Sequence, residues 1–117
     1  LRQKRANDPQ RAIRKIIGRA LRELKSVSQS DEGQVSEVVK NSLRRSLIAL
    51  IATDPQGIAK DGLRRQLEAH GIPSELSTDV LDIWEGAELL RYGGVSDAGA
   101  LKERAIELIE KLSRERL

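Results

Sequence analysis

Apolar residues recur every three or four positions in five separate parts of this chain, and nowhere do they alternate convincingly with polar residues as in a half-buried strand. This spacing places the apolar side chains on one face of an α-helix. Short polar segments rich in residues that end helices and form turns lie between these parts. The sequence therefore predicts an all-α fold, a single compact bundle of about five helices with short connections that covers residues 1–117. The predicted helices are residues 8–27, 34–52, 60–70, 74–92 and 97–116.

The segment from Gly71 to Gly94 most clearly begins and ends a helix. Gly71 suits the left-handed conformation that ends one helix, and Pro73 favours the first turn of the next. Gly93 and Gly94 then stop the helix predicted over residues 74–92. This helix contains the only Trp and ends at the only Tyr of the chain. Its apolar face consists of Leu76, Val80, Ile83, Trp84, Ala87 and Leu90.

The composition restricts both the core and the possible chemistry. Aromatic residues make up 2% of the 117 residues and Phe is absent, so the core is aliphatic and the several exposed aromatics of a base-stacking platform are missing. The absence of Cys excludes disulfides, thiolate metal sites and cysteine nucleophiles. No apolar run approaches the ~20 residues that span a bilayer. Residues 34–52 have the widest apolar arc and are predicted to form the central helix.

Positive charge is concentrated at the start of the chain. Residues 1–27 carry nine basic and two acidic side chains, whereas the remainder carries twelve basic and sixteen acidic ones. Residues 1–7 form a basic lead-in, and Asp8 is predicted to cap a helix that begins with Pro9. In this helix, residues 8–27, six cations fall on the face opposite the apolar one. The cations are Arg11, Arg14, Lys15, Arg19, Arg22 and Lys25. The apolar face is predicted to comprise Ile13, Ile16, Ile17, Ala20, Leu21, Leu24 and Val27.

Three interpretations of the basic face stay open at this point. Charged stripes are common on surface helices, so the face is explained by simple solvation. Alternatively, the cations contact the phosphates of a nucleic acid. They also suit anionic lipid headgroups on the cytoplasmic side of a membrane span. Pairing within the helix does not account for them, because almost no acidic residue stands among them.

The sequence offers little for catalysis. His70 is the sole histidine and lacks a metal-binding HxxxH or HExxH pattern, so it is predicted to be an ordinary residue of a helix end. Gly57 and the Gly93-Gly94 pair lack the flanking residues of a phosphate-binding loop. The carboxylates of residues 74–92 form an outward, solvated stripe. They are Glu75, Asp79, Asp82 and Glu85. The sequence thus predicts no catalytic, cofactor-binding or metal-binding residue, and no enzyme.

Glu88, Arg91 and Tyr92 lie together at the end of the helix predicted over residues 74–92. Glu88 and Arg91 are three residues apart, a spacing that allows an ion pair. Tyr92 is predicted to pack its ring over the last turn and to keep its hydroxyl in water. We interpret the three as a structural helix-end motif.

The second half of the chain resembles the C-terminal cytoplasmic helical domain of the BatD-type oxygen-tolerance (aerotolerance) membrane proteins. The likeness is carried by LRRQLEAHGIP (63–73), Val80-Leu81, Trp84, the run from Glu88 to Tyr92, and LKERAIELIEKL (101–112). The basic segment from Arg2 to Lys25 is similar to the segment that follows the last transmembrane helix of that family. The chain departs from the family pattern at Val38-Val39, where an aromatic is expected, and at Ala59, where a Ser or Thr cap is expected.

The resemblance implies a longer, membrane-anchored protein with this domain on the cytoplasmic side of the bacterial inner membrane. A transmembrane segment is then expected to end shortly before Leu1. Members of this family share operons with von Willebrand A-domain membrane proteins and a MoxR-type AAA+ ATPase, which implies these proteins as partners. No active site and no cofactor come with the resemblance.

Two functional hypotheses follow. The first is a non-enzymatic protein–protein interaction module of an aerotolerance or stress-response complex, in which residues 8–27 form a juxtamembrane basic helix near an anionic membrane surface. In this hypothesis the other helices present a docking surface to partner proteins. The alternative is a helical nucleic-acid-binding domain that uses the same basic face. The sequence does not predict the oligomeric state.

Overall fold

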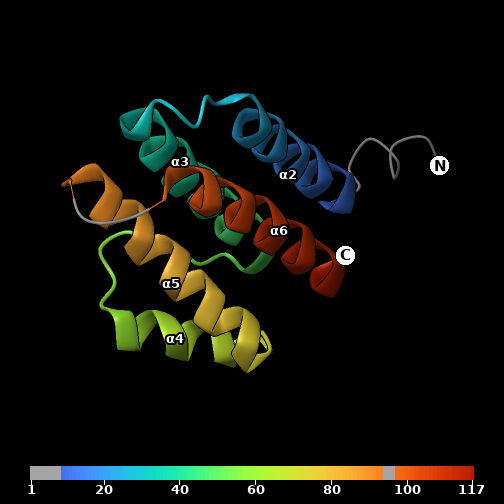
Figure 1. Ribbon diagram of the computed structural model, residues 1–117. Coiled ribbons are helices and arrows are strands. Elements are labelled where there is room, and N and C mark those ends of the chain that lie inside the picture. The colour runs from blue at the N-terminus through green and yellow to red at the C-terminus, as the bar shows by residue number, and fades with distance from the viewer. Residues whose placement is uncertain (1–8, 94–96) are drawn as a thin grey trace.

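The computed structural model describes residues 9–93 and 97–117, and every regular element within these ranges is an α-helix (Figure 1). The prediction of an all-α bundle of about five helices is confirmed. The predicted basic lead-in, residues 1–7, and the predicted cap Asp8 lie outside the described residues. The helices are α2 (Pro9–Ser26), α3 (Glu32–Ile51), α4 (Lys60–Ala69), α5 (Ser74–Arg91) and α6 (Ala98–Arg116).

Helix α3 is the centre of the bundle, as its wide apolar arc predicts. It packs against α2, α5 and α6, whereas α4 packs against α5. Figure 1 shows α2 along one side of α3 and α6, with α5 and α4 on the other side. Leu43 and Leu47 of α3 are completely buried. Burial of a side chain of this size contributes about 1.5–3 kcal/mol. The core is aliphatic throughout the described residues, and the half-buried Trp84 packs against it from α5.

Three serines of α3 lie in the buried contacts between helices. The Ser36 hydroxyl donates to the carbonyl of Ala87 in α5 at 2.6 Å. The Ser42 hydroxyl donates to the carbonyl of Ala20 in α2 at 3.4 Å, and Ser46 is also buried. Small side chains let the helix backbones approach closely, and each buried hydroxyl is satisfied by a carbonyl. The apolar pattern does not predict these serines as core residues.

Within the described residues, aspartate caps set the starts of α3 and α6. The Asp31 carboxylate accepts a hydrogen bond from the backbone N–H of Gln34 at 3.1 Å, so α3 begins at Glu32, two residues before the predicted start at residue 34. Asp97 caps α6 in the same way, as the sequence predicts. Helix α4 has no side-chain cap, since Ala59 occupies its N-cap position.

The end of α2 is held by a cation from α6. The Lys102 ammonium donates to the carbonyl oxygens of Lys25 at 3.2 Å and of Val27 at 2.7 Å. The last carbonyls of a helix have no partner within the helix and carry partial negative charge, so a cation there is favourable. This contact joins the end of α2 to α6, while the buried Ile17, Ala20 and Leu24 turn the opposite side of α2 to solvent. Within the described ranges, no helix is both long and apolar enough to cross a membrane.

Candidate docking surface

The cationic face of α2, formed by the six basic residues predicted from the sequence, is exposed along the whole helix. These residues are Arg11, Arg14, Lys15, Arg19, Arg22 and Lys25. They lie opposite the buried Ile17, Ala20 and Leu24. None of the six takes part in an ion pair within residues 9–93 and 97–117. The face therefore combines six positive charges that the described part of the fold leaves without a counter-charge.

Glu23, the one acidic residue of α2 as described, is already paired. Its carboxylate lies 3.1 Å from the guanidinium of Arg45 in α3, which places a further cation beside the cationic face. Arg45 was not predicted as a site residue, because its proximity to α2 depends on the way two helices pack. Nothing in the local sequence indicates that contact.

An open groove of about 680 Å³ lies between α2 and α3. Four cations line it, three from α2 and Arg45 from α3, together with the paired Glu23. Ala12 and Ile16 form its apolar part. We call this feature the α2–α3 groove. It brings basic and apolar side chains together in one concave site.

Ile16 corrects the prediction made from the sequence. It was predicted on the buried face of the first helix, but its side chain is 42% exposed. At ~100° per residue, Ile16 lies at the edge of the apolar stripe next to Arg19. Helices α3 and α6 cover the middle of the stripe, where Ile17 and Leu24 are buried, and leave this edge uncovered. The α2–α3 groove thus owes its apolar part to a residue that the bundle does not bury.

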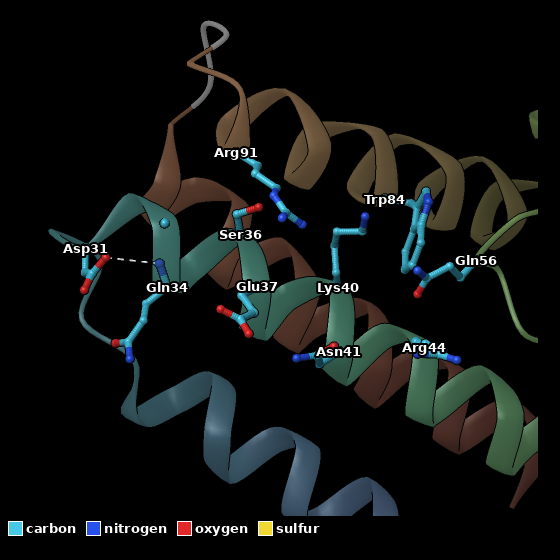
Figure 2. A pocket seen from close by; sticks show the side chains of 11 residues that line it. Asp31, Gln34, Ser36, Glu37, Lys40, Asn41, Arg44, Gln56, Trp84 and Arg91 are labelled. Atoms are coloured by element: carbon cyan, nitrogen blue, oxygen red, sulfur yellow. Dashed lines mark hydrogen bonds between the residues drawn. The ribbon is translucent and has the colours of Figure 1, made fainter.

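A second groove, of about 540 Å³, lies between α3 and α5 and is shown in Figure 2. We call it the α3–α5 groove. Three cations line it, Lys40 and Arg44 from α3 and Arg91 from α5. Figure 2 shows Lys40 and Arg91 reaching into the space between the helices, with Trp84 standing as a flat wall beside Lys40. The Lys40 ammonium lies 4.8 Å from the centre of the Trp84 ring.

Two of the three cations in the α3–α5 groove have counter-charges. Lys40 lies 3.7 Å from the carboxylate of Glu88, and the Arg44 guanidinium donates two hydrogen bonds to Asp54 at 3.0 and 2.9 Å. The hydrogen bond from Arg44 lowers the pKa of Asp54 below its ordinary 3.8, and the backbone N–H of Gln56 lowers it further. The same side-chain hydrogen bond raises the pKa of Arg44. This groove is therefore largely neutralised by the fold itself.

The predicted helix-end motif is arranged differently from the expectation. The sequence spacing allows an ion pair between Glu88 and Arg91. In the structure, the Glu88 carboxylate pairs with Lys40 of α3 instead. The Arg91 guanidinium lies 5.9 Å from the centre of the Tyr92 ring, a loose cation–π distance. Tyr92 is 80% exposed, so its ring does not pack closely over the last turn. The three residues do not converge on one site.

His70 and Glu85, one of the four carboxylates of the acidic stripe of α5, have local partners. The Nδ1 of His70 lies 2.8 Å from the carbonyl of Gln66, and the His70 carbonyl accepts from Arg116 at 2.7 Å. On α5, Glu85 pairs with Lys60 at 2.8 Å, which raises the pKa of Lys60. Glu75 and Asp82 are exposed, and Asp79 is half-buried. In the described part of the chain, no three His, Asp or Glu side chains are arranged to hold a metal ion.

Comparison of the chain with models of protein families, with curated proteins and with solved structures finds no match. The two grooves and the cationic face of α2 are therefore the features from which a function can be inferred.

Proposed function

We propose that this chain is a non-enzymatic docking module that binds an anionic membrane surface through the cationic face of α2 and presents the rest of the bundle to partner proteins. One observation carries the proposal: all six cations of the face are exposed, and none has a counter-charge within the described ranges. Like charges along one helix face repel each other, so an external anionic surface stabilises this arrangement.

The number of cations suits reversible attachment to lipid. A Lys or Arg near an anionic membrane contributes about 1 kcal/mol, so the face supplies up to about 6 kcal/mol before the cost of association. Because α2 is held to α6 by Lys102, the bound face fixes the orientation of the whole bundle. Helix α5, on the other side of the bundle, then points away from the membrane (Figure 1).

The identity of the partners rests on the resemblance alone. In a BatD-type protein the domain lies on the cytoplasmic side of the inner membrane. Its proposed partners there are von Willebrand A-domain membrane proteins and a MoxR-type AAA+ ATPase. The full-length gene tests this part, because a transmembrane segment is expected shortly before Leu1. A gene that encodes a protein without such a segment contradicts it.

Vesicle binding tests the central part of the proposal. The chain is sedimented with vesicles of phosphatidylglycerol and phosphatidylcholine, with vesicles of phosphatidylcholine alone, and separately titrated with short duplex DNA at ~0.1 M salt. We expect binding to the anionic vesicles, none to the neutral ones, and weaker binding to DNA. Binding to DNA that is tighter than binding to the vesicles favours the alternative, a nucleic-acid-binding domain. No binding to either anion contradicts both functions.

A further inference from the structure

We infer that the α2–α3 groove is a site for a single anionic phospholipid, with the lipid phosphate between the cations and the upper part of an acyl chain on Ile16 and Ala12. The inference rests on the proposed function and deepens it. The proposed function needs only the exposed charges of α2, whereas this inference adds a defined lipid site in one groove. The groove volume, about 680 Å³, is within the usual range of small-molecule sites.

The charges of the groove suit a phosphate. Lys15, Arg19 and Arg22 succeed one another along α2 at spacings of four and three residues, so they lie on one side of the helix. Arg45 adds a guanidinium from α3 on the opposite wall. Arg side chains bind phosphate oxygens through two parallel N–H groups, and such charge-assisted bonds are stronger than neutral ones. Glu23 offsets one of these four cations, which leaves a net positive groove.

The apolar part of the groove suits hydrocarbon. Ile16 is 42% exposed, although this chain buries most of its large aliphatic side chains. It stands directly between Lys15 and Ile17 in the sequence, at the boundary of the cationic face and the core. A membrane-surface helix shows the same order, with basic side chains at the headgroups and an apolar edge at the acyl boundary. Covering Ile16 removes apolar surface from water, which favours binding independently of salt.

This order of side chains favours a lipid over other anions. In a phospholipid the phosphate is covalently linked to hydrocarbon, so one molecule satisfies the cations and covers Ile16. In a nucleic acid the phosphates lie on sugars, and binding is almost wholly electrostatic and falls steeply with salt. An inserted apolar residue therefore leaves a part of the binding that persists at high salt.

The experiment compares two exposed isoleucines. Ile16→Ser changes the groove, whereas Ile48→Ser changes a residue of α3 that is 44% exposed and does not line the groove. Wild type and both variants are sedimented with vesicles of equal parts phosphatidylglycerol and phosphatidylcholine at ~0.1 M and ~1 M salt, where the screening lengths are about 10 and 3 Å. Thermal unfolding of all three checks that the fold is kept.

We expect Ile16→Ser to weaken vesicle binding roughly five-fold at both salt concentrations, because the variant no longer buries the exposed part of the isoleucine side chain on the lipid. Ile48→Ser should bind like wild type, and wild type should keep measurable binding at ~1 M salt. Equal binding by the two variants overturns the inference but leaves the proposed function intact. Loss of all wild-type binding at ~1 M salt also overturns it. Failure of wild type to bind at ~0.1 M salt contradicts the proposed function itself.

Discussion

The α2–α3 and α3–α5 grooves lie on two flanks of the same central helix and are both lined by several cations, yet their electrostatics differ. Asp31 and Glu37 line the α3–α5 groove, and Glu88 and Asp54 beside it supply counter-charges to Lys40 and Arg44. Among the described residues that line the α2–α3 groove, the only acid is Glu23, and it pairs with Arg45 of α3. The number of basic residues around a groove thus says little about binding. Binding of an external anion depends on whether acidic residues of the fold already pair with these basic residues.

The two grooves also differ in their apolar contacts. Trp84, in the α3–α5 groove, is partly covered by Lys40 and packs against the core, so its contacts stabilise the bundle. Ile16, in the α2–α3 groove, stays 42% exposed. The comparison predicts that changes in the first groove alter stability, whereas changes in the second alter binding.

The largest effect is expected from removing three cations at once. The triple variant Lys15→Gln, Arg19→Gln and Arg22→Gln loses about 3 kcal/mol of attraction to anionic vesicles, or roughly a 100-fold weaker partition, because each cation contributes about 1 kcal/mol. Its unfolding free energy should stay near that of wild type, since these side chains have no ion pairs within the described ranges. Sedimentation with vesicles and urea denaturation measure the two quantities.

The matched control has the same change in net charge in the other groove. This control is the triple variant Lys40→Gln, Arg44→Gln and Arg91→Gln. We expect its affinity for vesicles to lie within a few-fold of that of wild type and its free energy of unfolding to be lower. Equal loss of vesicle binding in both triple variants would show that net charge alone governs binding. The distinction between the grooves would then be wrong.

A smaller effect is expected from the buried contact between α3 and α5. Ser36→Ala removes the hydroxyl that donates to the Ala87 carbonyl at 2.6 Å and should lower the free energy of unfolding by about 1–2 kcal/mol. The control is Ser26→Ala, which removes a hydroxyl that donates to the Glu23 carbonyl on the exposed surface. Urea denaturation should show no more than a few tenths of a kcal/mol for the control. Equal values for the two serines would contradict the role given to the buried contact.

Loss of the Lys40 ammonium should lower the free energy of unfolding by less than Ser36→Ala does. Lys40→Gln removes the contact with Trp84 and the pairing with Glu88, and we expect a destabilisation of about 0.5–1 kcal/mol. The fluorescence of Trp84 should change with it, since the ammonium lies over the ring. Lys15→Gln is the control, since Lys15 has no ion pair within residues 9–93 and 97–117, and it should leave both stability and fluorescence unchanged. If Lys15→Gln lost as much stability as Lys40→Gln, the two grooves would not differ in their effect on stability.

The smallest effect concerns the Arg44–Asp54 pair, because exposed ion pairs contribute little to stability. The pKa of Asp54 is lower in the folded protein, so this carboxylate stabilises the fold above its ordinary pKa of 3.8. That contribution is lost as the pH falls from about this value through the lower folded pKa. Asp54→Asn should therefore reduce the loss of stability in acid, as measured by thermal unfolding at a series of pH values. An unchanged acid dependence would contradict the assigned shift.

Sequence periodicity predicts the elements of this fold well, because each helix buries one regular stripe. The stripe Leu101, Ala105, Leu108, Ile109 and Leu112 is buried in α6 as predicted. The exposed cations of α2 follow from the same reasoning. Periodicity does not show how far a neighbouring helix covers a stripe, which is why the exposure of Ile16 was not predicted. It is also silent on contacts between helices, such as Glu23 with Arg45 or Ser36 with Ala87.

The most direct test of the account is to determine which side of the bundle meets the membrane, and the sole Trp makes it possible. In wild type the fluorescence emission of Trp84, on the α5 side, should stay unchanged when anionic vesicles are added. In the variant Ile16→Trp with Trp84→Phe, emission from position 16 should shift to shorter wavelength on the same vesicles. A shift at Trp84 with none at position 16 would contradict the central claim that the α2–α3 groove faces the lipid.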